Sequence, residues 1–234
     1  MSDDMLERWE PRLRSFAAEH LPDSDPAHDL AHIQRVVANA RALAAVEGAD
    51  MPIVIPAAWL HDCVVLPKDS DRRPQASRLA ATVAGDFLQG EGFPPAYIPA
   101  ICHAIEAHSF SAGIPAETLE AKVVQDADRL DAIGAIGIAR CLLLGGVMKK
   151  PLYDLEQPFP ATRPADDTKN VLDHFYLKLL KIESMMQTPA GRSEARRRTA
   201  VMEVYLGELG RELVGGSLGD FPANVKNTPQ GHQT

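Results

Sequence analysis

The chain has few cysteines and no long hydrophobic run. Its 234 residues include only Cys63, Cys102 and Cys141, and no two of them form a CxxC pair. This spacing argues against a structural zinc knuckle, so the three thiols are expected to fill core positions in a reducing compartment. No apolar run is long enough to cross a bilayer, and no basic segment followed by an apolar core opens the chain. We therefore expect a cytoplasmic protein.

Positive charge is also in short supply. The chain has 24 lysines and arginines against 32 aspartates and glutamates, which gives a formal net charge of -8. Proteins that bind nucleic-acid backbones usually present a basic face, so we expect no stable nucleic-acid binding and no membrane partner. Small anionic substrates are compatible with this balance if local cations receive them. The sequence leaves a homodimer open.

Aromatic residues make up only 6% of the chain, whereas hydrophobic residues make up 45%. Alanine and leucine dominate the apolar set, and both are strong helix formers. Few segments show the alternation of apolar and polar residues that is typical of strands. We therefore predict an all-α protein with a single helical domain over residues 1–214, interrupted by a long irregular loop. Residues 215–234 are predicted to form a flexible tail.

Helical periodicity gives the expected elements. The first helix carries Pro11, where we expect a kink or a late start, and the second should stop at Gly48. Four prolines make residues 145–168 the irregular loop. The expected helical ranges are 1–20, 28–46, 52–64, 76–88, 94–108, 117–125 continuing through 123–140, 169–186 and 191–214.

Three carboxylates gather in residues 123–140. Asp126, Asp128 and Asp131 lie within about two helical turns of one another, in an otherwise apolar stretch. Asp128 and Asp131 are three apart and share a helix face. Buried carboxylates are costly unless something pairs with them, and a cation is the simplest partner. The alternative is a solvated acidic turn at a helix start, where Asp is favoured.

Histidines supply the other half of a metal site. His32, the adjacent His61 and Asp62, and Asp128 come from three separate segments with apolar neighbours. A lone histidine on a helix is more often structural, so the set carries the prediction. If the four side chains converge, they offer two imidazole nitrogens and two carboxylate oxygens. This mixed shell suits one divalent ion with open water positions, such as Mn²⁺, Mg²⁺, Fe²⁺ or Ni²⁺.

The ordered set resembles the HD-domain metal-dependent phosphohydrolases, and in particular a small stand-alone bacterial branch of that family. Its pieces are AHDLAHIQRV around His32, AAWLHDCV around His61 and Asp62, and QDADRLDAIGAIGIAR around Asp128. An HSFS element at 108–111 and an HFYLKLL element at 174–180 extend the resemblance over nearly the whole chain, from about Asp25 to Glu212.

This resemblance implies an HD-type helical bundle in which His32, His61, Asp62 and Asp128 bind the metal. It also implies hydrolysis of a nucleotide, or of a related phosphoester or phosphoanhydride, by attack of a metal-activated water. The earlier His-Asp pair at 28–29 is taken as incidental, although His28 lies one turn before His32 and could support the site.

Four further residues complete the expected site. Asp131 is predicted to orient the attacking water or a ligand histidine, and its alternative role is a structural carboxylate. His108 is predicted to protonate the leaving oxygen, because imidazole titrates in the useful range. Lys68 and Lys178 are predicted to bind substrate, since each lies close to a motif element. Their alternative is a solvated surface position.

Two other functions stay open at this point. One is a di-iron oxygenase on the same fold, which needs additional ligands from His103 and His108. The other is a nucleotide sensor that keeps the fold and binds its ligand without turnover.

Overall fold

The computed structural model describes residues 2–21, 29–66, 70, 72–109 and 112–214. Across these ranges the structure has nine α-helices and no strand, which confirms the predicted all-α class. The chain divides into two compact units: Met1–Asp131 with Met186–Glu194, and Ala132–Met185 with Ala195–Thr234. The single domain over residues 1–214 stays a prediction, and the predicted tail at 215–234 lies outside the described residues.

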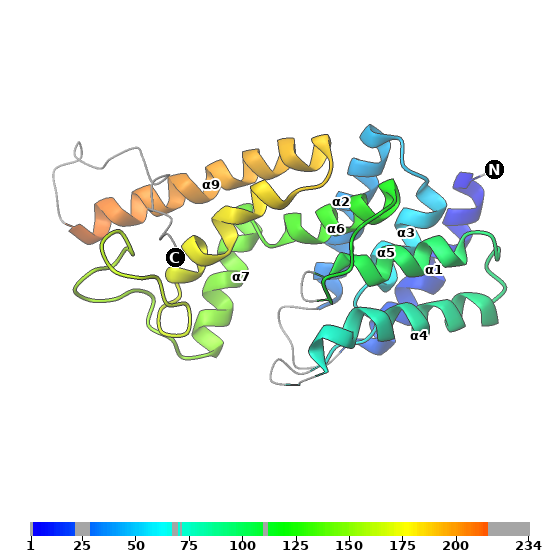
Figure 1. The fold of residues 1–234 in the computed structure, drawn as a ribbon, viewed down its shortest axis with the longest axis horizontal. Coiled ribbons are helices and arrows are strands. Elements are labelled where there is room, and N and C mark those ends of the chain that lie inside the picture. The colour runs from blue at the N-terminus through cyan, green and yellow to red at the C-terminus, as the bar shows by residue number, and fades with distance from the viewer. Residues whose placement is uncertain (1, 22–28, 67–69, 71, 110–111, 215–234) are drawn as a thin grey trace, which may run out of the picture. The chain divides into compact units, whose positions relative to one another are not determined.

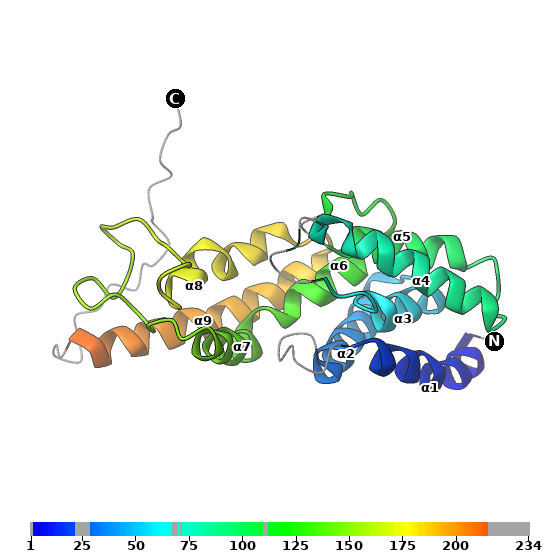
Figure 2. The same cartoon turned by 90° about the horizontal axis from the view of Figure 1, so that it is seen from below.

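The first unit is a bundle built around one short helix (Figure 1). Its central helix α3 contacts each of the other five helices, and α4 and α5 lie side by side (Figure 2). The sequence explains this position, since residues 54–60 are all apolar and all buried. The helices are α1 (Ser2–His20), α2 (Leu30–Glu47), α3 (Met51–Leu60), α4 (Ala76–Gly90), α5 (Ile98–His108) and α6 (Leu119–Asp131).

Helix α2 shows how local signals place one functional residue. The Asp29 carboxylate caps its start by accepting the backbone N–H of His32 at 2.7 Å, and Gly48 ends it at φ 75°. The buried face contains His32, Ile33 and residues at helical spacing beyond them. Asp29 is therefore a capping residue, and this cap turns His32 into the interior. Helix α1 runs from Ser2 with Pro11 inside it, without the late start that the sequence allowed.

Asp126 has a different role from its two acidic neighbours on α6. Its carboxylate accepts the backbone N–H groups of Gln187 and Thr188, each at 2.8 Å, and the Thr188 hydroxyl at 2.8 Å. These donors precede α9 (Pro189–Val214), whose first residues belong to the first unit. The hydrogen bonds satisfy Asp126 without a cation, so of the three aspartates on α6 only Asp128 and Asp131 are left for a metal centre.

A tight contact at Gly191 makes this anchor testable. A Cβ atom at Gly191 would lie 2.3 Å from Asp126 Oδ2 and 2.8 Å from Thr188 Oγ1. We expect Gly191→Ala to disrupt the hydrogen bonds of Asp126 and to lower the free energy of unfolding by ~2–3 kcal/mol. Urea titration followed by circular dichroism measures this change.

The matched control is Gly207→Ala in the same helix, where nothing lies within 4 Å of the added Cβ. Alanine is a better helix former than glycine, so this variant should gain ~0.5–1 kcal/mol. If both substitutions stabilised the protein equally, the Asp126 and Thr188 side chains would be shown to move away from the added Cβ without cost.

The second unit contains α7 (Gly134–Val147), α8 (Asp173–Leu177), the 3-10 segment Leu179–Met185 and the rest of α9. The helix expected to run unbroken through 123–140 is interrupted at residues 132 and 133. Gly134 begins the next helix at φ +76°, a backbone conformation that residues other than glycine rarely adopt. The prediction of one helix over 169–186 is also wrong, because only α8 and the 3-10 segment form there. Residues 148–172 form no helix.

No single helix in the described ranges is both long and apolar enough to cross a membrane. Taken together, the consecutive helices α6 and α7 are long and apolar enough, judged by length and composition alone. This is weak evidence, since eight of the thirteen residues of α6 are buried in the bundle.

Candidate metal centre

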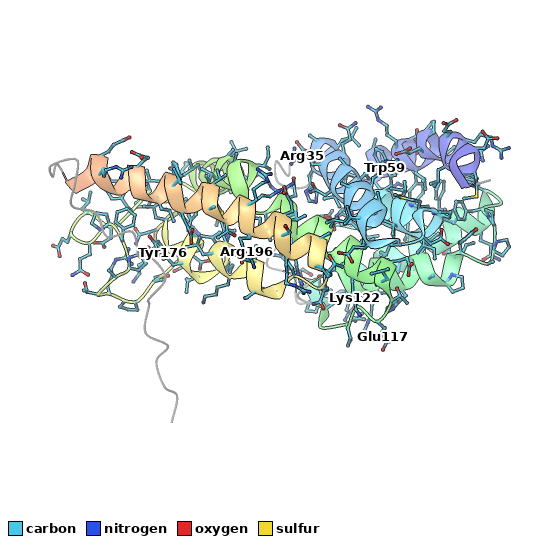
Figure 3. The ribbon with its side chains drawn as sticks, turned by 90° about the horizontal axis from the view of Figure 1, so that it is seen from above. Arg35, Trp59, Glu117, Lys122, Tyr176 and Arg196 are labelled. Carbon is cyan, nitrogen blue, oxygen red and sulfur yellow. The ribbon has the colours of Figure 1, made fainter. Side chains whose placement is uncertain are left out.

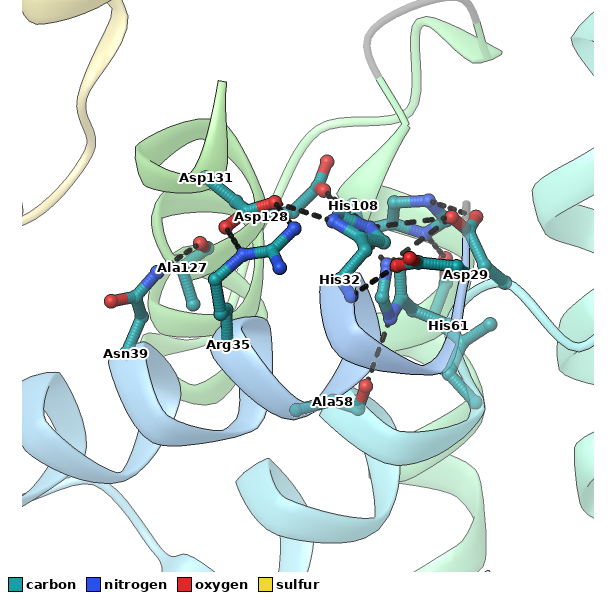
Figure 4. Close-up of polar contacts among 12 residues, drawn as sticks. Asp29, His32, Arg35, Asn39, Ala58, His61, His108, Ala127, Asp128 and Asp131 are labelled. Carbon is teal, nitrogen blue, oxygen red and sulfur yellow. Dashed lines mark hydrogen bonds and ion pairs between the residues drawn. The ribbon is translucent and has the colours of Figure 1, made fainter. Parts of the chain in front are cut away.

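Four helices of the first unit deliver polar side chains to one place. His32 lies in the first turn of α2, and His61 and Asp62 follow directly on the last residue of α3. His108 is the last residue of α5. Asp128 and Asp131 lie in the last turn of α6. Figure 4 shows the imidazoles of His32, His61 and His108 gathered beside the end of α6. The ends of the helices, rather than their middles, therefore build the site.

The distances between the candidate ligand atoms are long for hydrogen bonds, at 3.4–3.8 Å, and suit a shared ion. His32 Nε2 lies 3.7 Å from Asp62 Oδ2 and 3.6 Å from Asp128 Oδ1. His61 Nε2 lies 3.4 Å and 3.8 Å from the same two oxygens. Ligands at about 2.0–2.2 Å from one metal ion stand about 3 Å apart at right angles. A small inward movement of each side chain would therefore complete a coordination shell.

The ring nitrogens of the histidines are oriented for metal binding. His61 Nδ1 donates to the carbonyl of Ala58 at 2.9 Å, and His108 Nδ1 donates to the carbonyl of Ile105 at 2.6 Å. A carbonyl only accepts, so each Nδ1 carries a proton, and each Nε2 is the nitrogen available to a metal ion. His61 Nε2 is buried and has no hydrogen-bond partner among the described residues. A buried nitrogen in this state is costly unless a cation or a hydrogen-bond donor meets it.

The His32 ring is held by a side chain rather than by a backbone carbonyl. Its Nδ1 donates to Asp131 Oδ2 at 2.7 Å, and Asp131 also accepts two hydrogen bonds from Arg35. Asp131 is only 1% exposed, so its contacts within the protein decide its orientation. This places Asp131 behind a candidate ligand histidine, while its catalytic role stays a prediction. Arg35 was not predicted from the sequence, although it lies one helical turn after His32.

The charges of the cluster are strongly coupled. Burial alone would lower the pKa of His32, but the hydrogen bond to Asp131 and the nearby carboxylates of Asp62 and Asp128 outweigh it and raise the pKa from 6.5 to about 9. Burial also raises the pKa of Asp62, but His61, His108 and His32 together hold that pKa well below its usual range. Without a metal ion, protonated imidazole therefore neutralises the carboxylates, and a divalent cation would replace that proton.

The amino-acid sequence of this region matches a known family. Residues 29–133 match the HD domain. The Bacillus subtilis protein YpgQ is 33% identical over 208 residues, which cover 87% of this chain and 93% of YpgQ. The chain belongs to the HD domain family.

Solved structures of HD proteins share the fold over almost the whole chain. The crystal structure of YpgQ in complex with ADP matches with a TM-score of 0.68 at 33% identity, over 88% of this chain and 98% of YpgQ. An HD-superfamily hydrolase from Bacillus thuringiensis matches with a TM-score of 0.70 at 30% identity, over 92% of this chain and 100% of that protein. These matches confirm the resemblance to small bacterial HD proteins.

The HD residues predicted as metal ligands are all brought together, and one more histidine joins them. Two groups have ligand atoms close enough to hold an ion: His32 with His61 and Asp128, and His61 with Asp62 and His108. His108 Nε2 lies 3.5 Å from Asp62 Oδ1, so His108 lies inside the cluster. Its predicted role as proton donor and a role as metal ligand are both open on this geometry.

Other predicted residues lie apart from the cluster or beyond the described ranges. His103 accepts the backbone N–H of Glu117 at 3.3 Å and belongs to neither candidate group. Lys178 is 63% exposed in the second unit, where it binds Asp167 at 3.2 Å beside His174. Lys68 and His28 fall outside the described residues. Substrate binding by Lys68 and Lys178 stays a prediction.

Proposed function

We propose that this HD-domain chain is a metal-dependent phosphohydrolase that acts on a nucleotide or a related phosphoester or phosphoanhydride. One observation carries the proposal: His32, His61 and His108 have Nδ1 tied by hydrogen bonds, and His32 and His61 turn Nε2 toward the carboxylates of Asp62 and Asp128. The donor set of nitrogen and carboxylate oxygen fits Mn²⁺, Mg²⁺, Fe²⁺ or Ni²⁺. The choice among these ions is open.

A bound divalent ion supplies Lewis acidity, which polarises a phosphoryl oxygen and lowers the pKa of a bound water. His32, His61, Asp62 and Asp128 would hold that ion. Asp131 keeps the ring of His32 in place through Nδ1. His108 has its Nδ1 proton committed to a backbone carbonyl, so only its Nε2 is available to carry a proton to a leaving oxygen.

A nucleotide is the proposed substrate class because the related YpgQ was crystallised with ADP. Phosphoryl transfer needs extra positive charge around the phosphate oxygens, and the net acidity of the chain makes local cations necessary. We propose that Lys68 and Lys178 supply part of this charge. Lys178 already shares Asp167 with His174, so its movement toward a phosphate would break an existing ion pair.

A screen of nucleoside mono-, di- and triphosphates tests the proposal. Each is incubated with the protein and Mn²⁺ or Mg²⁺, and the products are resolved by anion-exchange chromatography so that pyrophosphate is separated from single phosphate. We expect turnover of at least one nucleotide that EDTA abolishes and added metal restores. Saturable nucleotide binding without release in any condition would favour the non-catalytic sensor instead.

A di-iron oxygenase is the second candidate, because His108 adds a third imidazole to the cluster and creates two ligand groups that share His61. The position of His103 weighs against it, since that histidine lies apart from both groups. Elemental analysis of the purified protein separates the two functions. Two irons per chain favour the oxygenase, and one divalent ion favours the hydrolase.

A further inference from the structure

Arg35 makes a two-point contact with the buried carboxylate behind the metal centre. Its Nε donates to Asp131 Oδ1 at 2.6 Å, and its Nη2 donates to Asp131 Oδ2 at 3.1 Å. The Arg35 side chain is 34% exposed, whereas Asp131 and His32 are 1% and 2% exposed. Arg35, which projects from α2 (Figure 3), therefore links the protein surface to the interior of the site.

The three histidines of the cluster differ in how their rings are held. His61 and His108 each donate Nδ1 to the carbonyl three residues earlier, at Ala58 and Ile105. Ala58 lies in the last turn of α3, which His61 follows directly, and Ile105 lies in α5 together with His108. The local backbone therefore fixes these two rings.

His32 is held in a different way. It lies in the first turn of α2, where the carbonyl three residues earlier, at Asp29, already accepts the N–H of Ile33 at 3.3 Å. Its Nδ1 instead donates to Asp131, a side chain from another helix. A side-chain carboxylate can rotate, so the placement of the His32 ring depends on how the Asp131 carboxylate is held.

The fork geometry of the Arg35 contact constrains the Asp131 carboxylate. Two N–H groups in a rigid plane bind both carboxylate oxygens, and this fixes the plane of the carboxylate as well as its position. Asp131 Oδ2 then accepts from Arg35 and from His32 at once (Figure 4). The order of contacts is Arg35 to Asp131, Asp131 to His32, and His32 Nε2 toward the carboxylates of the site.

We infer that Arg35 is a positioning residue for the metal centre, which acts through Asp131 to hold the Nε2 atom of His32 toward the ion. The inference rests on the proposed metal-dependent function, since it assigns a role relative to that ion. In the contacts described, Arg35 touches none of the four candidate ligands, so its effect passes through Asp131.

Calorimetric titration of the metal-free protein with Mn²⁺ tests this role. Substituting a residue that supports a metal ligand weakens metal binding by about 10–100-fold, so Arg35→Gln should raise the Kd for Mn²⁺ by about tenfold or more. Arg35→Lys keeps the charge but offers a single ammonium, and should restore only part of the affinity. A Kd for Arg35→Lys equal to the parent value would overturn the two-point contact as the cause.

Arg41→Gln is the matched control. Arg41 lies on the same helix and also forms an ion pair, with Glu10 at 2.7 Å, but that pair lies away from the metal centre. Its Kd for Mn²⁺ should equal the parent value. Thermal unfolding of each variant shows whether the helix itself is intact.

A double-mutant cycle separates positioning through Asp131 from a general structural effect. In an Asp131→Asn background, Arg35→Gln should weaken Mn²⁺ binding by less than about twofold further, because the contact through which it acts is already lost. Losses that multiply would overturn the inference. A parent protein that binds no Mn²⁺ would remove the proposed function as well, whereas normal binding by Arg35→Gln would overturn this inference alone.

Discussion

Replacing Asp128 with alanine is expected to abolish metal retention and turnover together. The Asp128 carboxylate lies 3.6 Å from His32 Nε2 and 3.8 Å from His61 Nε2, between the two imidazoles. Without it, Asp62 is the only carboxylate left in the candidate ligand set, and a divalent ion loses both a ligand and half of the charge that the ligand carboxylates supply. A metal ion contributes several kcal/mol to phosphoryl transfer, so turnover should fall by roughly 10³-fold or more.

The measurement pairs metal content by elemental analysis with turnover of the nucleotide found in the screen. Asp86→Ala serves as the control, because Asp86 is an exposed carboxylate on α4 and the change removes the same charge from the chain. The control should keep its metal and its activity. Full activity in Asp128→Ala would remove the metal-dependent mechanism, and equal losses in both variants would point to a general charge effect.

The second large effect is a dependence of metal affinity on pH. The metal-free site holds a proton on His32 at neutral pH, since the pKa of that imidazole is raised from 6.5 to about 9. The ion needs the same Nε2 lone pair, so binding must displace the proton. As the pH increases toward about 9, the affinity for Mn²⁺ should rise by about tenfold per pH unit. Above about 9 the affinity should level off.

The stability of the fold should move in the opposite direction in the metal-free protein. Protonated His32 stabilises the folded state fully below its unfolded pKa of 6.5, and this contribution is lost as the pH rises through about 9. The increase in unfolding temperature caused by Mn²⁺ should therefore grow with pH. Calorimetry in two buffers of different ionisation enthalpy should show release of about one proton near neutral pH. An affinity that does not change with pH would contradict the charge state assigned to His32.

Much of the metal centre could be predicted from the sequence, because each residue has its own local signal. His61 and Asp62 follow a helix that is apolar on every side, which draws its end into the core. His32 lies at helical spacing with Ile33 and Val36 on the buried face. The resemblance to HD proteins supplied the order of these pieces along the chain, and the distances between them follow from the fold.

Arg35 and Asp126 show where sequence reasoning stops. The partner of Arg35 lies 96 positions away on α6, and only the packing of α2 against α6 brings the two together. Asp126 and Asp128 are two positions apart, so they point to different sides of one helix. That much follows from helical spacing, but the backbone donors to Asp126 lie more than sixty positions later, just before α9.

The break between α6 and α7 has a similar cause. The stretch contains Gly134 and Gly137 in a continuous apolar run, and helix propensity alone does not choose between an uninterrupted helix and a turn. Gly134 adopts φ +76° with the aliphatic part of the Arg198 side chain packed against it. Arg198 lies on α9, so this contact forms only in the folded protein and cannot be predicted from the residues around Gly134.

The central claim is that His32, His61, Asp62 and Asp128 share one divalent ion, and anomalous diffraction from crystals grown with Mn²⁺ tests it most directly. The account predicts one strong anomalous peak within about 2.0–2.3 Å of both His Nε2 atoms and of an oxygen from each carboxylate. A map with no peak among these four side chains, in crystals that show bound Mn²⁺ elsewhere, would contradict it.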